Sequence, residues 1–346
     1  MKKLFCIVFC LILFVFIGCS APEKAEAREF FAMDTLMFVN VYGADAPAAL
    51  DAAEAEVDRL DALLSTQNEA SEIAKVNASA GISPVKVSPD TLDILQQALK
   101  YGALTDGALD VSIYPVSNAW NIQSGVPKVL SDSEIAGLLP LVDYRKVALD
   151  TAACTVYLPQ KGMGMDLGAV GKGYASDRLV ELFQAKGVSR ALFSLGGNVG
   201  CMGGRPDGTP WRVGIRDPRG QPNDYLGYVS IRDGFVITSG DYERFFIRDG
   251  VRYHHILDPG TGRPAWNGVR SVSIISDDGT LADCYSTALF VMGLEKGLAF
   301  QKAQSDFVQG GFEAIYVMDD GRVIATPGAR SIFTFTGKDA GYTYAP

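Results

Sequence analysis

The sequence predicts an α+β fold. Amphipathic helices and short strands follow one another along the chain without a strict β-α-β alternation, a pattern typical of antiparallel or mixed sheets with helices packed against them. The chain has 346 residues, 48% of them hydrophobic, which is ample for a substantial core. After residue 29 there is no internal repeat, low-complexity block or linker, so we expect a single domain over residues 30–346.

The N-terminal residues differ in composition from the rest. Two lysines precede an apolar run over residues 4–17, which is followed by Gly18 and Cys19. A positive start, a short apolar run and a small residue before the cut site are typical of an export signal, and the run is too short for a comfortable membrane span. The segment resembles a bacterial lipobox. The resemblance implies a signal peptide over residues 1–18, lipidation of Cys19, a flexible tether over 19–29, and an exported protein anchored to the bacterial membrane.

Charge and cysteine content exclude some functions. The formal net charge of -9 gives no basic surface for nucleic acid, so a phosphate-bearing ligand needs local donors or a metal. Apart from the signal and Cys19, the cysteines are Cys154, Cys201 and Cys284, an odd number without metal-ligand spacing. We expect free thiols and no stabilising disulfide.

The first half of the domain predicts one strand and several helices. Residues 31–42 alternate as a strand that contains Met33-Asp34-Thr35 near its start, and residues 46–64 carry apolar side chains at helical spacing. Ser88 and Pro89 favour the N-cap and first turn of a second helix that runs to about residue 101. The remaining segments are a turn-rich connection over 105–110, an aromatic segment over 114–120, a short helix over 131–139 and a strand over 156–158.

The second half becomes glycine-rich from Met163 and then predicts more strands than helices. The predicted elements are a helix over 174–186, a buried strand over 191–195, pairs of strands and turns over 211–256, a strand over 271–275, a helix over 281–292 with Thr280 as its cap, and a hairpin over 312–325.

His254 and His255 are the only two histidines in the chain. Histidine has the unperturbed pKa nearest neutral pH, which makes the pair a candidate for proton transfer, although paired histidines on a strand are often structural. An Asp-Tyr-Glu-Arg cluster precedes them and a predicted tight turn over 258–262 follows. This setting favours an active-site loop, in which one histidine acts while its neighbour points to the other face of the strand.

The glycine-rich segment over 166–173 has two open interpretations. Glycines before a helix let backbone N–H groups approach phosphates. The segment lacks both the Walker spacing and the dinucleotide spacing, so on its own it is equally compatible with a structural turn and with a ligand loop.

Asp283 and Thr287 also have two interpretations. They are four residues apart in a predicted helix, so their oxygens share one face and suit Mg²⁺. With Thr280 at the N-cap, however, Asp283 would stand at N3 and could simply cap the helix. Four aromatic side chains could similarly stack on a planar ring or pack in the core; they are Tyr114, Trp120, Trp211 and Tyr242.

Together these segments occur in a familiar order. From about residue 30 to residue 337 the chain resembles the ApbE family, the FAD:protein FMN transferases, many of them exported lipoproteins. The matching segments are 33–35, 106–120, 166–178, 194–198, 238–264 and 281–293. The resemblance implies a single ApbE-type, T-fold-like domain with mixed and antiparallel sheets and flanking helices.

The resemblance also implies an activity. The family cleaves FAD, its substrate, at the pyrophosphate and attaches FMN by a phosphoester to a Thr or Ser of a partner protein, releasing AMP. Here the implied partner is an exported flavin acceptor, such as a redox-complex subunit. By position, the Mg²⁺ ligands are the side chains of Asp283 and Thr287 and the backbone carbonyls of Ala169 and Ser286. The flavin-nucleotide contacts are Met33, Asp106, Gly107, Ala108, Asp166, Lys172 and Ile256.

His255 matches the more regular histidine of the family and is the implied base for the acceptor hydroxyl, with His254 packing. Asp283 would act through the metal, and an Asp near the metal is the alternative base. Two other functions stay open: an FAD pyrophosphatase, in which water replaces the acceptor, and a flavin carrier without chemistry. A carrier needs neither a metal at the pyrophosphate nor a base, so Asp283, Thr287 and His255 together favour an enzyme.

Overall fold

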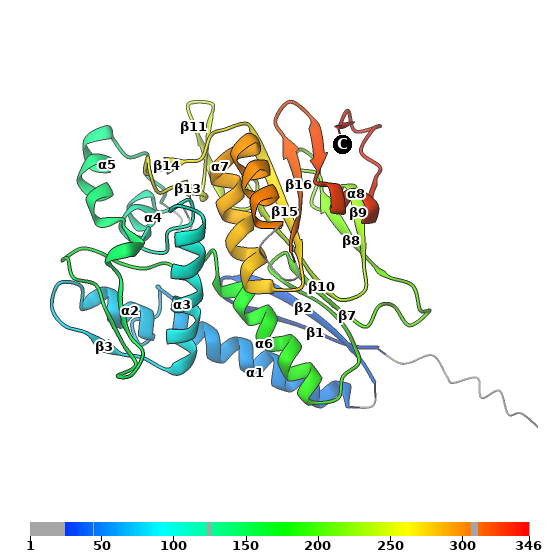
Figure 1. Cartoon of the computed structure of the whole chain (residues 1–346), viewed down its shortest axis with the longest axis horizontal. Helices are drawn as coiled ribbons and strands as arrows, with labels where there is room; N and C mark the ends of the chain where they lie inside the picture. Colours follow the sequence, from blue (N-terminus) through cyan, green and yellow to red (C-terminus); the bar gives the residue numbers. More distant parts are fainter. Residues whose placement is uncertain (1–24, 44, 123–125, 306–310, 346) are drawn as a thin grey trace, which may run out of the picture.

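The computed structural model describes residues 25–43, 45–122, 126–305 and 311–345, so the expected signal peptide and Cys19 lie outside the described residues. A nine-stranded sheet crosses the molecule (Figure 1). Its order is β1 (Ala25–Ala32), β2 (Thr35–Tyr42), β6 (Arg190–Leu195), β7 (Asn198–Met202), β10 (Gly234–Gly240), β15 (Val269–Ser276), β16 (Glu313–Met318), β17 (Arg322–Ala325), β19 (Thr343–Tyr344). Neighbouring strands are antiparallel except for β17 and β19, which confirms the predicted α+β class with a mixed sheet.

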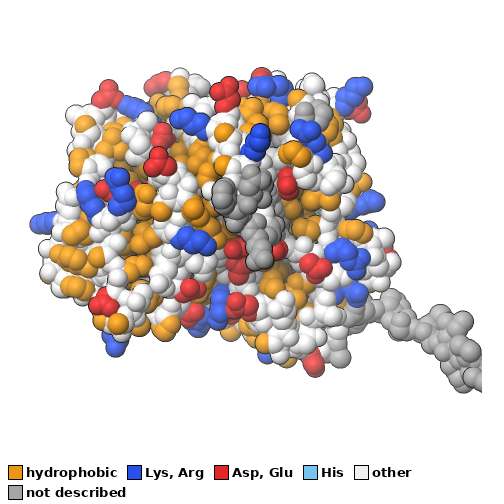
Figure 2. All heavy atoms as spheres, viewed as in Figure 1, with side chains coloured by type: hydrophobic (Ala, Val, Ile, Leu, Met, Phe, Trp, Pro, Cys, Tyr) orange, Lys and Arg blue, Asp and Glu red, His pale blue; other side chains and the backbone are white. Residues whose placement is uncertain are grey.

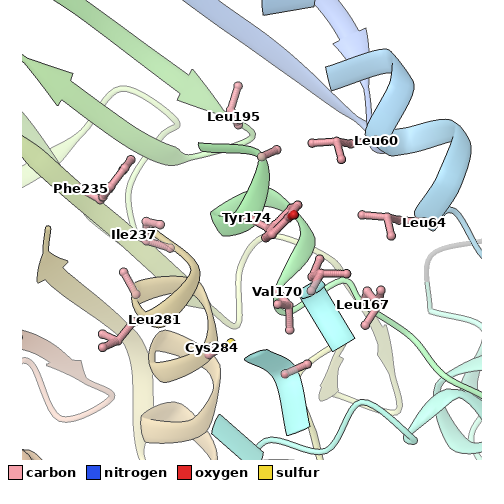
Figure 3. Packing of buried hydrophobic residues seen from close by; sticks show 14 of the residues in the cluster. Leu60, Leu64, Leu167, Val170, Tyr174, Leu195, Phe235, Ile237, Leu281 and Cys284 are labelled. Atoms are coloured by element: carbon pink, nitrogen blue, oxygen red, sulfur yellow. The ribbon is translucent and has the colours of Figure 1, made fainter. Parts of the chain in front are cut away.

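Three long helices cover one face of this sheet: α1 (Ala46–Leu64), α6 (Gly171–Ala185) and α7 (Gly279–Ser305). A fourth long helix, α3 (Pro89–Leu104), packs against α7. In α1 the buried positions follow the predicted apolar stripe, including Leu50, Val57 and Leu60. Figure 3 shows Leu60 approaching Tyr174 of α6, with Leu281 and Cys284 of α7 nearby. Burying this stripe stabilises the helices far more than their intrinsic propensity does. The main core therefore lies between the sheet and α1, α6 and α7.

A smaller core lies on the other face. The sheet β18 (Phe333–Phe335), β9 (Tyr225–Ile231), β8 (Trp211–Arg216) packs there together with α8 (Pro327–Ile332). Short elements complete the described fold: α2 (Glu72–Ala78), β3 (Val85–Lys86), α4 (Tyr114–Trp120), α5 (Asp132–Leu138), the 3₁₀ turns Leu139–Leu141 and Tyr144–Lys146, β4 (Ala148–Asp150), β5 (Thr155–Tyr157), β11 (Phe245–Arg248), β12 (Val251–His254), β13 (Leu257–Asp258) and β14 (Arg263–Pro264).

The first strand differs from its prediction. Residues 31–42 form a hairpin, because Met33 and Asp34 have φ of 49° and 57° and reverse the chain between β1 and β2. Two residues with positive φ are the usual geometry of a tight hairpin turn. Pairing with β2 also extends β1 back to Ala25, so residues 25–29 belong to the sheet and not to a tether.

The helix that contains Asp283 begins and ends at other residues than the sequence predicts. α7 begins at Gly279, and Asp278 is its cap, because the Asp278 carboxylate accepts a hydrogen bond from Leu281 N at 2.7 Å. Thr280 lies within the helix and donates to Asp177. At the other end, Gly293, with φ of 76°, kinks the helix at the expected stop, and a further segment runs to Ser305. Sequence patterns also missed helices α2 and α4 and placed the start of α6 three residues late.

The face of the molecule shown in Figure 2 carries charges of both signs. Figure 2 shows basic and acidic side chains scattered between hydrophobic ones on the face in view. None of the helices in the described part of the chain combines the length and apolar character needed to cross a membrane. Cys154, Cys201 and Cys284 are free thiols, as expected.

Candidate active site

Two adjoining cavities, of about 540 Å³ and 390 Å³, open beside the β1–β2 turn. They lie among that turn, α4, the start of α6 and the segments around β10 and β12. The residues common to both are Asp34, Ser117, Asp166, Gly168, Lys172, Arg244, His255 and Leu257. Shared walls make the two cavities one continuous site.

The smaller cavity brings together Ala169, Asp283 and Thr287. Asp283 is 4% exposed, and its Oδ2 accepts a hydrogen bond from the backbone N of Gly173 at 2.8 Å. The Thr287 hydroxyl lies 3.2 Å from the Ser239 hydroxyl of β10. The capping interpretation of Asp283 is therefore wrong: Asp278 caps α7, and Asp283 links α7 to α6 at the cavity wall.

These donors fit a hard divalent cation. Among residues placed in the structure, no three His, Cys, Asp or Glu side chains gather as a metal site. A cation here would therefore meet one carboxylate, a hydroxyl and backbone carbonyls, with substrate phosphates and water completing its shell. That is the usual pattern for Mg²⁺. Ser286 does not line either cavity: it is fully buried, and its hydroxyl contacts the Asp283 carbonyl and the Ser239 hydroxyl. A role of its backbone carbonyl as a metal ligand stays a prediction.

Gly173 explains part of the glycine-rich segment. A Cβ at this position would stand 2.3 Å from the Gly279 carbonyl oxygen and 2.6 Å from the Asp283 Cβ. Only glycine lets α6 and α7 approach this closely. Asp166, Gly168 and Lys172 of the same segment line both cavities. The segment is thus both a packing element and a wall of the site.

The two histidines have separate surroundings. His254 is buried, with its ring 5.5 Å from that of Phe290 in an edge-to-face arrangement. His255 lines both cavities, and its backbone N and its Nδ1 contact the Arg244 carbonyl at 3.0 Å and 3.2 Å. This matches the expectation that one histidine packs and the other faces the site.

The protonation of His255 follows from these contacts. A carbonyl oxygen only accepts hydrogen bonds, so Nδ1 donates to Arg244 and Nε2 carries the lone pair. Burial, and next the positive charge of Arg244, lower the pKa of His255 to about 3. The imidazole is therefore neutral at pH 7 and able to accept a proton.

The expected flavin contacts are divided. Met33 lines the larger cavity, Ala108 and Ile256 line the smaller one, and Asp166 and Lys172 line both. Asp106 and Gly107 are not on either wall: with φ of 50° and 78° they form the left-handed turn after α3, where Asp106 is exposed. The turn instead positions Ala108. Any role of Asp106 and Gly107 in flavin binding stays a prediction.

Most of the candidate stacking aromatics belong to the packing. Trp120 is fully buried and donates to the Gly262 carbonyl at 2.8 Å, and Trp211 is also buried. Tyr242 packs under the Arg216 guanidinium, 4.7 Å from its ring centre. Tyr114 alone of the four lines a cavity.

Sequence reasoning assigned no role to several residues of the cavity walls. Ser117 donates to the Asp166 carboxylate at 3.1 Å, and the Arg244 guanidinium donates to the Asp34 carbonyl at 3.2 Å. Ser239 contacts Thr287 from β10. Arg244 belongs to the Asp-Tyr-Glu-Arg cluster before the histidine pair, and Asp34 and Ser117 lie in the matching segments 33–35 and 106–120, but the sequence predicted no contact for any of the three.

Comparisons with known proteins agree with this arrangement. The model of the ApbE family matches residues 33–310. An FAD:protein FMN transferase from Treponema pallidum is 38% identical over 330 residues, covering 89% of this chain and 90% of that protein. A second one, from Klebsiella pneumoniae, is 35% identical and covers 83% of this chain and 86% of its own length.

Solved structures agree as well. The ApbE protein from Thermotoga maritima superposes with a TM-score of 0.82 at 31% identity, covering 89% of this chain and 99% of that one. The flavin transferase ApbE from Vibrio cholerae gives a TM-score of 0.79 at 28% identity, covering 90% and 100%. The curated relatives are enzymes. With most of its length matched by the family model and by relatives above 30% identity, this chain belongs to the ApbE family.

Proposed function

We propose that the protein is an Mg²⁺-dependent FAD:protein FMN transferase that attaches FMN to a Thr or Ser hydroxyl of an exported acceptor protein and releases AMP. The observation that carries this proposal is a single cavity lined by the oxygen ligands Asp283 and Thr287 and by the neutral imidazole of His255. The names of the curated relatives supply the substrate class.

The site suits a dinucleotide. The adjoining cavities give two compartments for the two halves of FAD, and both volumes lie in or near the ordinary range for small-molecule sites. Lys172 and Arg244 line both compartments where they join. Their positive charges would hold a pyrophosphate at the junction, beside Asp283.

Asp283 and Thr287 would hold the metal, with the Ala169 carbonyl as a further ligand. A Mg²⁺ ion bound there supplies positive charge that stabilises the pyrophosphate oxygens and the AMP leaving group. The Gly173 N–H fixes one oxygen of the Asp283 carboxylate, which orients the other. Charge stabilisation and positioning are the main requirements of phosphoryl transfer.

The Nε2 atom of His255 would accept the proton of the acceptor hydroxyl. The Arg244 carbonyl holds the proton on Nδ1 and thereby fixes the reactive tautomer. The hydroxyl oxygen then bonds to the FMN phosphorus, and the P–O bond to AMP breaks. A pyrophosphate beside the ring raises the pKa of His255 from its low value, which makes the imidazole a better base when substrate is bound.

One experiment tests this function. The chain from Ser20 onward is incubated with FAD, Mg²⁺ and an exported candidate acceptor, and the products are separated on a denaturing gel. We expect a covalently fluorescent acceptor band together with AMP. Free FMN and AMP without a labelled band would assign FAD hydrolysis instead, and unchanged FAD would assign a carrier.

The location of the protein is a further part of the proposal. The apolar run over residues 4–17 and Cys19 support an exported lipoprotein anchored to the bacterial membrane. Cys19→Ala should move the protein from the membrane fraction to a soluble one and abolish incorporation of labelled fatty acid. Membrane association that is unchanged in this variant would contradict a lipid anchor on Cys19.

A further inference from the structure

Three exposed apolar side chains lie together at the tip of the β1–β2 hairpin. Phe31, Leu36 and Phe38 are 69%, 41% and 44% exposed. Phe31 pairs directly with Leu36 across the two strands, and Phe38 follows two residues later on the same face. Cross-strand partners have Cβ atoms about 5 Å apart and neighbours at i and i+2 are about 7 Å apart, so the three form one contiguous patch. We call it the hairpin patch.

The hairpin patch is an uncovered part of a sheet face that is elsewhere buried. Tyr42, Leu192 and Val199 lie on the same face of β2, β6 and β7 and pack against the core formed with β8 and β9. Near the β1–β2 turn that second layer ends. Alternate residues of the hairpin, such as Met37, are buried against the helices on the opposite face. The exposure of Phe31, Leu36 and Phe38 is therefore not needed to build the core.

The hairpin patch is continuous with the active site. Phe31 lines the larger cavity together with Met33 and Asp34 of the adjoining turn. Arg244 ties this turn to the backbone that holds His255, since its guanidinium donates to Asp34 and its carbonyl accepts from His255. The patch thus borders the opening through which a macromolecular hydroxyl must reach the site.

We infer that the hairpin patch is the docking surface for the acceptor protein, which would lay apolar side chains flanking its Thr or Ser against Phe31, Leu36 and Phe38. The inference rests on the proposed function, because only a transferase needs a protein at this opening. A specific protein interface covers about 800 Å² on each partner, so contact must extend beyond the cavity. Aromatic side chains commonly dominate the binding energy of such interfaces.

The test uses Leu36 and Phe38, which are not on the cavity walls. The full-length Leu36→Ser/Phe38→Ser chain is compared with the native chain in transfer to the acceptor that the native chain labels. We expect kcat/KM for the acceptor to fall at least tenfold, while the affinity for FAD and any release of FMN in the absence of acceptor stay unchanged. Leu36→Met/Phe38→Leu should restore transfer, because it restores apolar surface.

Ile82→Ser is the matched control, since Ile82 is 76% exposed and does not line the site. It should leave transfer unchanged. Equal kcat/KM in the native and double-serine chains overturns the inference and leaves the transferase standing. A native chain that releases FMN but labels no acceptor overturns both.

The double-serine variant also distinguishes two other possible partners of the hairpin patch, a second copy of this chain and a membrane. If the double-serine change alters the mass of the native particle in light scattering and leaves acceptor kinetics unchanged, the hairpin patch joins two copies of this chain. If it weakens binding of the lipidated chain to phospholipid vesicles without changing transfer, the hairpin patch lies on the membrane. Either result overturns docking of the acceptor.

Discussion

The cavity has two walls of different construction. The helix wall comprises Ala169, Asp283 and Thr287, and behind it α6 and α7 meet closely at Gly173. The loop wall comprises Asp34, Ser117, Arg244 and His255, which come from turns and short elements. Arg244 joins Asp34 and His255 through backbone carbonyls, and Ser117 contacts the Asp166 carboxylate. The helix wall offers oxygen ligands at a fixed helical spacing. The loop wall offers a base and positive charge whose placement depends on contacts between distant segments.

The largest expected effect tests the helix wall. Asp283→Asn keeps an acceptor for the Gly173 N–H but removes the negative charge that would bind Mg²⁺. We expect transfer to fall about 10³-fold, in line with the loss of one preorganised electrostatic contact. Mg²⁺ affinity, measured by calorimetry with FAD bound, should fall as well.

Asp177→Asn is the matched control for that change. Asp177 is half-buried beside α7, but it accepts hydrogen bonds from Gly279 and Thr280 and does not line the cavity. It should lower stability and leave Mg²⁺ affinity intact. Equal loss of Mg²⁺ affinity in both variants would show that the metal does not depend on Asp283 specifically.

The next effect tests the loop wall. His255→Ala removes the proposed base and should lower transfer by about 10²- to 10⁴-fold, the usual contribution of general base catalysis. FAD affinity, measured by flavin fluorescence, should change little. A variant with undiminished transfer would remove His255 from the mechanism and shift attention to an aspartate.

These two walls also show what the sequence can predict. The regular elements followed their patterns: α1 has the predicted bounds, and the strands over 211–256 formed as expected. Patterns failed where a reversal needs only two residues of positive φ, as at Met33 and Asp34, because alternation continues through such a turn. They also failed at the start of α7, where the cap comes from Asp278 and not from Thr280.

In the site, too, features that depend on local spacing could be predicted, and contacts between distant residues could not. Asp283 and Thr287 could be paired from sequence because their spacing is local, and the neighbouring histidines could be separated because a strand alternates its faces. The contacts of Ser117 with Asp166 and of Asp34 with Arg244 could not be predicted, since they join residues far apart in sequence. The resemblance to a family pointed to Ala108, which lines the smaller cavity, but it did not reveal that Asp106 and Gly107 line neither cavity.

A smaller effect concerns the packing behind the helix wall. Gly173→Ala forces a methyl group against the Gly279 carbonyl, so α6 and α7 must separate. Overpacking of this kind costs about 1–3 kcal/mol of unfolding free energy. Gly171→Ala is the matched control, because a Cβ there meets no atom within 4 Å and its φ is not positive. Urea unfolding should separate the two variants; equal stability would show that the α6–α7 contact relaxes freely.

The smallest effect concerns the packing behind the loop wall, and it depends on pH. Burial lowers the pKa of His254 to about 4, below its ordinary value of 6.5, so between these values the unfolded chain binds a proton that the folded chain does not. Stability from this group is complete above pH 6.5 and is lost as the pH falls toward 4.

His254→Gln removes that linkage, so its stability should depend less on pH than that of the native chain. The difference between the two chains should reach about 2 kcal/mol between pH 7 and pH 4.5, since each pKa unit corresponds to about 1.4 kcal/mol. Asp177, whose pKa is raised to about 6 by burial, and His255 titrate in both chains, so the difference isolates His254. Urea unfolding at several pH values measures it. Parallel stability curves would mean that His254 accepts its proton inside the fold, and that its ring packs less tightly on Phe290 than the structure indicates.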